Sequence, residues 1–72
     1  MADRAWAVTS DMWGPFLWSI QEFRSEAIRA FFKGTGREFE TDADLMRAWR
    51  RYKYKWPDRR TRRIRIEVIE DQ

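Results

Sequence analysis

The sequence predicts a single α+β domain over residues 1–72, with the element order ββααβ. Three observations predict it: apolar residues alternate with small or polar ones near both ends of the chain, they recur at helical spacing in the middle, and turn-forming residues separate these segments. We expect a three-stranded, mainly antiparallel sheet with both helices on one face. A chain of 72 residues barely offsets the entropy lost on folding, so its aromatic residues, 17% of the total, are expected to supply much of the buried area.

A β-hairpin is predicted at the N-terminal end. Larger apolar side chains occupy every second position in two short runs, at Trp6 and Val8 and then at Phe16, Trp18 and Ile20. The residues between them, 10–15, read Ser-Asp-Met-Trp-Gly-Pro and are typical of a turn. We therefore expect strands over 5–9 and 16–20, joined by an exposed tip that carries Met12 and Trp13.

The first of two helices follows the hairpin. Its apolar positions at helical spacing are Phe23, Ala27, Ile28, Phe31 and Phe32. Gly34 is expected to end it in a left-handed conformation. The start has two candidates, Ser19 with Glu22 or a later residue near Arg24 or Ser25, and the strand pattern that precedes the helix favours the later one.

The second helix has clearer limits. Thr41 followed by Asp44 resembles a capping box, and Pro57 disfavours helical geometry at Trp56. At 100° per residue, one face carries Leu45, Ala48, Trp49, Tyr52 and Trp56. This apolar face is expected to pack on the sheet.

A final strand is predicted after a turn at Pro57-Asp58. Ile64, Ile66 and Val68 alternate there with charged residues, so the apolar side is expected to face the core. The core-facing residues of the whole sheet are then predicted to be Trp6, Val8, Trp18, Ile64, Ile66 and Val68. These patterns leave the strand order open.

Catalysis finds little support in this composition. The chain has neither histidine nor cysteine, which removes the usual neutral-pH base, the usual nucleophile and the thiolate or imidazole ligands of zinc. The acidic stretch from Glu38 to Asp44 lacks the glycine and distal glutamate of a calcium loop, and residues 34–36 give only Gly-x-Gly. We predict no enzymatic activity, no cofactor and no metal site.

The most informative feature for function is a basic block. Residues 47–65 hold ten basic side chains and one acid, Asp58, for a net charge of +9, although the whole chain carries only +3. Arginine outnumbers lysine by twelve to three in the chain, and the guanidinium fork suits phosphate and carboxylate oxygens. The predicted partner-binding residues are Arg47, Arg50, Arg51 and Tyr54 on the polar face of the second helix, Arg59, Arg60, Arg62 and Arg63 after it, and Trp13 at the hairpin tip. We expect the arginines to form one continuous patch.

Three interpretations of this block stay open. The patch docks on an acidic or nucleic-acid-bearing protein complex, or it binds DNA or RNA directly, with Tyr54 or Trp13 stacking on a base. Otherwise it is a solvated face whose arginine stems shield aromatic residues of the core, in a monomer or a structural homodimer. The N-terminal residues lack the apolar run of a signal peptide, and no segment reaches the roughly 20 apolar residues of a membrane span, so we expect a protein of the host-cell cytoplasm that does not bind membranes.

The layout of the chain resembles that of small orphan proteins of phages and prophages. The resemblance rests on Ala-Trp-Ala-Val at 5–8, Phe-Leu-Trp-Ser-Ile at 16–20, the helix from 24 to 31, and the basic-aromatic run before residues 63–68. It spans nearly the whole chain and includes no diagnostic motif. Some phage proteins of this size are anti-CRISPR inhibitors, which act without catalysis by occupying a surface of an RNA-guided complex. The resemblance therefore implies a phage-type inhibitor, although the +9 block departs from the acidic, DNA-mimicking kind.

Overall fold

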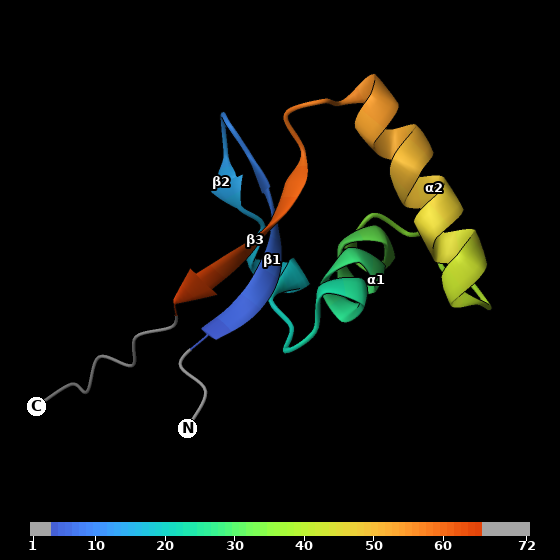
Figure 1. Cartoon of the computed structure of the whole chain (residues 1–72), viewed down its shortest axis with the longest axis horizontal. Coiled ribbons are helices and arrows are strands. Elements are labelled where there is room, and N and C mark those ends of the chain that lie inside the picture. Colours follow the sequence, from blue (N-terminus) through green and yellow to red (C-terminus); the bar gives the residue numbers. More distant parts are fainter. Residues whose placement is uncertain (1–3, 66–72) are drawn as a thin grey trace, which may run out of the picture.

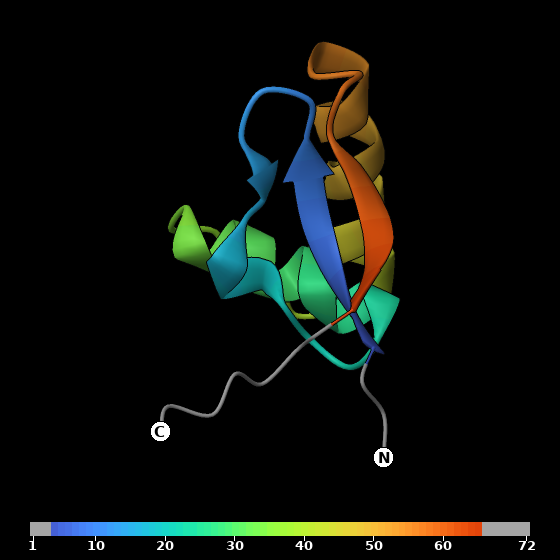
Figure 2. The same cartoon turned by 90° about the vertical axis from the view of Figure 1, so that its left-hand side faces the viewer.

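The structure, a computed structural model, describes residues 4–65. Its elements in chain order are β1 (Arg4–Ser10), β2 (Gly14–Pro15), the 3-10 helix η1 (Leu17–Ser19), α1 (Arg24–Gly34), α2 (Asp42–Lys55) and β3 (Arg60–Arg65). The strands form an antiparallel sheet in the order β2-β1-β3. Both helices lie on the same side of this sheet, α1 nearer to it and α2 farther out (Figures 1 and 2). The predicted α+β class and element order are confirmed.

The core lies between β1 and the two helices. Its buried cluster consists of Val8, Ile28, Phe31, Phe32, Leu45, Ala48 and Trp49, with Phe16, Phe39, Met46 and Tyr52 packed at the margin. Trp49 contacts both Phe31 and Phe32 edge to face, at centroid distances of 6.4 and 6.2 Å. Aromatic rings thus join the helices, as the composition predicts.

Both helices begin as the sequence indicates. α1 starts at Arg24, the later of the two candidate positions. At the start of α2 the Thr41 hydroxyl accepts a hydrogen bond from the Asp44 backbone N–H at 3.1 Å, which satisfies one orphan donor of the first turn. α2 ends at Lys55, directly before Trp56 and Pro57.

The second strand is much shorter than predicted. The structure has only the two residues of β2, followed by η1, where a strand over 16–20 was expected. Ser19 explains the difference, because its buried hydroxyl accepts a hydrogen bond from the Val8 backbone N–H at 2.9 Å and donates one to the Phe16 carbonyl at 2.6 Å. A side chain here replaces a strand backbone as the partner of β1. Pairing resumes only at Gln21, which forms a bridge with Trp6.

The glycines near the end of α1 have different roles from those predicted. Gly36, not Gly34, has the left-handed backbone, with φ of 89°. Gly34 is the last residue of α1, and a Cβ atom added there would overlap the indole ring of Trp18. That indole donates a hydrogen bond to the Phe31 carbonyl at 3.2 Å. Gly34 is therefore required by close packing.

The sheet orients fewer apolar side chains toward the helices than predicted. Val8 faces them, and its register partner on β3 is Thr61. Ile64 pairs with Ala5, and alternation along β1 places that pair on the opposite face of the sheet. Trp6 is only partly buried, and Trp18 is half exposed beside α1, so neither joins the buried cluster. Ile66 and Val68 lie outside the described residues.

The Ser19→Ala substitution should test the interrupted strand. It leaves the buried Val8 N–H without a partner, so the free energy of unfolding should fall by about 1–3 kcal/mol. Urea denaturation measures this change. Ser25→Ala, at an exposed position of α1, is the matched control and should change stability by no more than about 0.5 kcal/mol. Equal effects of the two substitutions would contradict the role given to Ser19.

A double-mutant cycle should test the contact between Gly34 and Trp18. Gly34→Ala should cost about 1–3 kcal/mol of folding free energy because the new methyl group meets the indole ring. In a Trp18→Ala background the same change should be neutral or stabilising by up to about 1 kcal/mol, since alanine is the better helix former. Thermal or urea unfolding of the four proteins gives the coupling. An unchanged cost in both backgrounds would rule out the contact as its cause.

Candidate interaction surface

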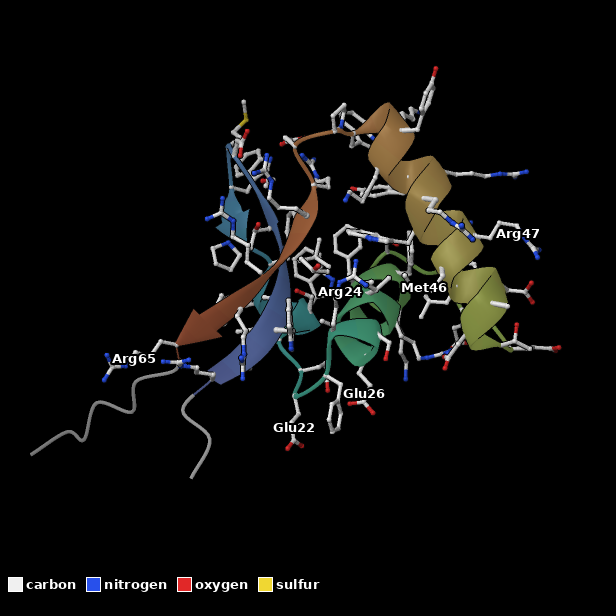
Figure 3. All side chains as sticks on the ribbon, viewed as in Figure 1. Glu22, Arg24, Glu26, Met46, Arg47 and Arg65 are labelled. Carbon is white, nitrogen blue, oxygen red and sulfur yellow. The ribbon has the colours of Figure 1, made fainter. Side chains whose placement is uncertain are left out.

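The polar face of α2 carries four of the predicted site residues. Arg47, Arg50, Arg51 and Tyr54 are all exposed, and Tyr54 is 91% exposed. They lie opposite Leu45 and Trp49, whose burial directs the other side of α2 into the core. Figure 3 shows Arg47 extending from α2 on the side away from the sheet. We call these four residues the α2 basic face.

Most of the charge on this face is unneutralised. Arg47 forms an exposed ion pair with Asp44 at 3.3 Å, one helical turn earlier. Across residues 4–65, the side chains of Arg50 and Arg51 have no hydrogen-bond or ion-pair partner. Their guanidinium groups are therefore available to an external anion.

A groove runs beside the α2 basic face. It has a volume of about 750 Å³ and separates α2 from residues 37–40. Arg47, Arg51 and Lys55 follow one another at i, i+4 and i+8 along the α2 wall. The aromatic residues in its lining are Phe39, Tyr52 and Trp56, and Glu38 and Glu40 line the other side. The groove thus combines a cationic wall with apolar surface that a partner side chain can contact.

Sequence reasoning missed the contribution of Lys55 and of residues 37–40 to this region. The position of Lys55 one turn after Arg51 was a usable signal. No sequence pattern indicated that Arg37 lies at the groove, because Arg37 belongs to the loop between the helices. Its guanidinium carbon lies 5.1 Å from the ring centroid of Phe32 and 5.2 Å from that of Phe39.

Arg59 does not belong to the exposed surface. Its side chain is only 15% exposed, forms an ion pair with Asp58 at 2.7 Å and donates a hydrogen bond to the Tyr52 hydroxyl at 3.3 Å. The guanidinium carbon also lies 5.7 Å from the ring centroid of Phe16 and 5.2 Å from that of Trp56. These contacts hold the turn between α2 and β3 against the aromatic core.

The remaining arginines are separated from the α2 basic face. Arg60 and Arg62 pair with Thr9 and Ala7, so they lie on the face of the sheet turned away from the helices. Arg63 pairs with Trp6 and lies on the other face of the sheet. Because the sheet and α2 are opposite layers of the domain, the structure does not bring the arginines into one continuous patch (Figures 1 and 2).

Trp13 lies at the exposed hairpin tip, as predicted, and is 70% exposed. Its backbone N–H donates to the Ser10 hydroxyl at 2.9 Å. Next to it, the Asp11 backbone N–H donates to Asp58 at 3.3 Å, which connects the tip to the turn after α2. Trp13 thus lies on the β3 side of that turn and not within the α2 basic face.

Neither a metal site nor a membrane span is found in the described part of the chain. Between residues 4 and 65 no group of three acidic side chains converges closely enough to hold a metal ion. Over the same residues, no helix has the length and apolar character that crossing a bilayer requires.

The two kinds of arginine should differ in their effect on stability. Arg59→Ala should lower the free energy of unfolding by about 1–2 kcal/mol, because it removes a largely buried ion pair and the contacts with two rings. Arg50→Ala, at an exposed helix position, should stay within about 0.5 kcal/mol of the parent protein. Urea denaturation measures both. Arg59→Lys keeps the charge but lacks the planar guanidinium group. Its free energy of unfolding should therefore lie between those of Arg59→Ala and the parent protein.

Comparisons of this chain with protein-family models, with curated proteins and with solved structures found no match.

Proposed function

We propose that this protein is a non-enzymatic interaction module that docks on an acidic or nucleic-acid-bearing surface of a host nucleic-acid-processing complex. The observation that carries this proposal is the α2 basic face, where Arg50 and Arg51 are exposed and, among residues 4–65, have no partner. A folded domain does not need these two charges for its own packing. Their concentration on one helix face supports recognition of an anionic surface.

Tyr54 supplies the apolar part of the proposed contact. Its 91% exposure means that the ring contributes almost nothing to the core of this domain. Tyrosine and arginine are the residue types that most often dominate binding energy when a partner covers them. A partner with an acidic rim and an apolar centre would therefore fit this helix face, and the aromatic residues of the adjacent groove would extend the contact.

The proposed biological role is that of a phage-type, anti-CRISPR-like inhibitor. The layout resemblance supports this class, and the mode of action needs only that the bound domain occupies a surface of the host complex. The exposed arginines of the 14-residue helix α2 would supply the surface that such binding needs. Inhibition would follow from binding alone and would be stoichiometric.

Direct binding of nucleic acid is the second candidate. It is favoured by the preference for arginine over lysine and by an exposed tyrosine beside two arginines, which would allow a base to stack while phosphates are bound. Salt dependence separates the two candidates. Phosphate binding releases counterions and weakens steeply as salt rises, whereas a protein interface with an apolar anchor depends less on salt.

The double substitution Arg50→Glu with Arg51→Glu should abolish function while preserving the fold. We expect affinity for the host complex to fall about 30-fold or more, because two central contacts are replaced by repulsion. Arg4→Glu with Lys33→Glu makes the same change in net charge at exposed positions outside the α2 basic face and should retain binding.

Binding is measured by fluorescence anisotropy with labelled duplex DNA, single-stranded DNA and RNA, and by pull-down of purified RNA-guided complexes. Tight nucleic-acid binding near physiological salt, with a log–log salt slope reduced by about 2 in the Arg50/Arg51 variant, would establish the second candidate instead. Equal binding by the two double variants would refute the α2 basic face as the site.

A further inference from the structure

One side of α1 is turned away from the core. The buried residues of this helix lie together on its other side. At 100° per residue, the side opposite them carries four residues, which we call the α1 outer face: Glu26, Arg29, Ala30 and Lys33. Figure 3 shows Glu26 extending from α1 away from both the sheet and α2. The packing of the domain therefore does not use this side of the helix.

Exposed apolar side chains border the α1 outer face. Leu17 and Phe23, in the segment that leads into α1, are 75 and 58% exposed, and Trp18 is half exposed between them. Two hollows of about 320 and 280 Å³ follow the helix, and Ala30 and Lys33 line both of them. Apolar surface of this kind, rimmed by charged residues, is typical of an interaction site.

Two charges on the α1 outer face have no partner. Arg29 is neutralised by Asp42 at 2.7 Å and donates a hydrogen bond to the Phe39 carbonyl, also at 2.7 Å. Within residues 4–65, Glu26 and Lys33 form neither an ion pair nor a hydrogen bond through their side chains. They are seven residues apart, about 10 Å along the helix axis, so they lie in one row but beyond the spacing of an i, i+4 pair.

A second copy of α1 in the antiparallel direction satisfies both charges. With a two-fold axis midway between Glu26 and Lys33, each Glu26 faces Lys33 of the second copy. A two-fold interface requires a surface that is complementary to itself, and an acid and a base at equal distances from the axis meet this requirement. The small side chain of Ala30 lies beside the axis and lets the two helices approach closely. We propose that the α1 outer face binds the same face of a second copy, giving a two-fold dimer.

The two charges also select this occupant over others. A parallel arrangement of the two helices would oppose Glu26 to Glu26 and Lys33 to Lys33, and like charges across an interface are unfavourable. An anionic partner such as a nucleic acid would match Lys33 but would be repelled by Glu26. The antiparallel second copy matches both charges at two symmetric positions.

The dimer would also cover apolar surface that a single chain exposes. Trp18 lines the hollow beside Ala30, so the helix of the second copy would cover part of the exposed indole. Arg47 and Glu26 extend from different helices in different directions (Figure 3), so the α2 basic face stays accessible in both copies. The dimer therefore does not rest on the proposed docking function.

Charge-swap variants of the full chain provide the test. Size-exclusion chromatography with light scattering should give twice the 8.9 kDa chain mass for the parent protein in the high micromolar range. Glu26→Lys and Lys33→Glu each place like charges opposite each other at two symmetric sites and should weaken the dimer by about tenfold or more. An equimolar mixture of the two variants pairs opposite charges at both sites and should restore the dimer.

Arg50→Glu, on the α2 basic face, makes the same charge change as Lys33→Glu and is the control that should dimerise like the parent. Circular dichroism checks that each variant is folded. If a charge variant fails this check, Ala30→Glu decides, because it keeps a good helix former and places two like charges beside the axis. It should weaken the dimer to a similar extent.

A parent protein that stays at the single-chain mass at several hundred micromolar overturns the proposal. Unaltered dimerisation of folded Glu26→Lys and Lys33→Glu also overturns it, and so does a mixture of the two that remains dissociated. Loss of dimerisation with retained binding of the host complex would leave the docking function standing, so the two failures are distinguishable.

Discussion

The aromatic cluster of this domain is centred on one phenylalanine ring, on which the packing of the two helices depends. Phe31 projects from α1 and contacts five other rings, at centroid distances from 5.2 to 6.4 Å. Those rings belong to the segment after β2, to α1 itself and to α2, so that segment and both helices meet at this side chain. The chain has no cysteine, and such a small domain gains most of its stability from apolar burial. The aromatic cluster around Phe31 therefore takes the place that disulfides or metals hold in many domains of similar size.

Local chemistry made much of the fold predictable. The Thr41 cap and the Pro57 stop act through neighbouring backbone groups, so the limits of α2 could be read from the residues themselves. The interruption of the strand after β2 could not be predicted from the sequence. The alternation over residues 16–20 is equally compatible with a strand and with a turn secured by the Ser19 hydroxyl. That hydroxyl bonds Val8, 11 residues away, and a contact at that separation leaves no local pattern. The orientation of Ile64 was missed for a similar reason, since alternation defines two faces without stating which one is covered.

The candidate site was predictable in composition but not in arrangement. A count of charges identifies the basic block, and helical geometry correctly groups Arg47, Arg50, Arg51 and Tyr54. Continuity beyond α2 was assumed from the sequence, yet the turn at residues 56–59 carries the chain from the outer helix layer back to the sheet. Arg59 shows why residue type is an insufficient guide. Its guanidinium, placed between two rings and beside Asp58, stabilises that turn and has little surface left for a partner.

The division of the arginines between opposite layers has a consequence for behaviour in mixtures of polyelectrolytes. A protein with one basic patch coats an anionic chain and leaves each chain separate. A protein with cationic groups on α2 and, across the domain, on β3 can contact two anionic chains at once, as a small cross-linker does. If the protein binds nucleic acid, as the second candidate function proposes, RNA should form networks with it near charge equivalence and redissolve when either component is in excess. Under that proposal, the layered position of a few arginines favours condensation over simple coating.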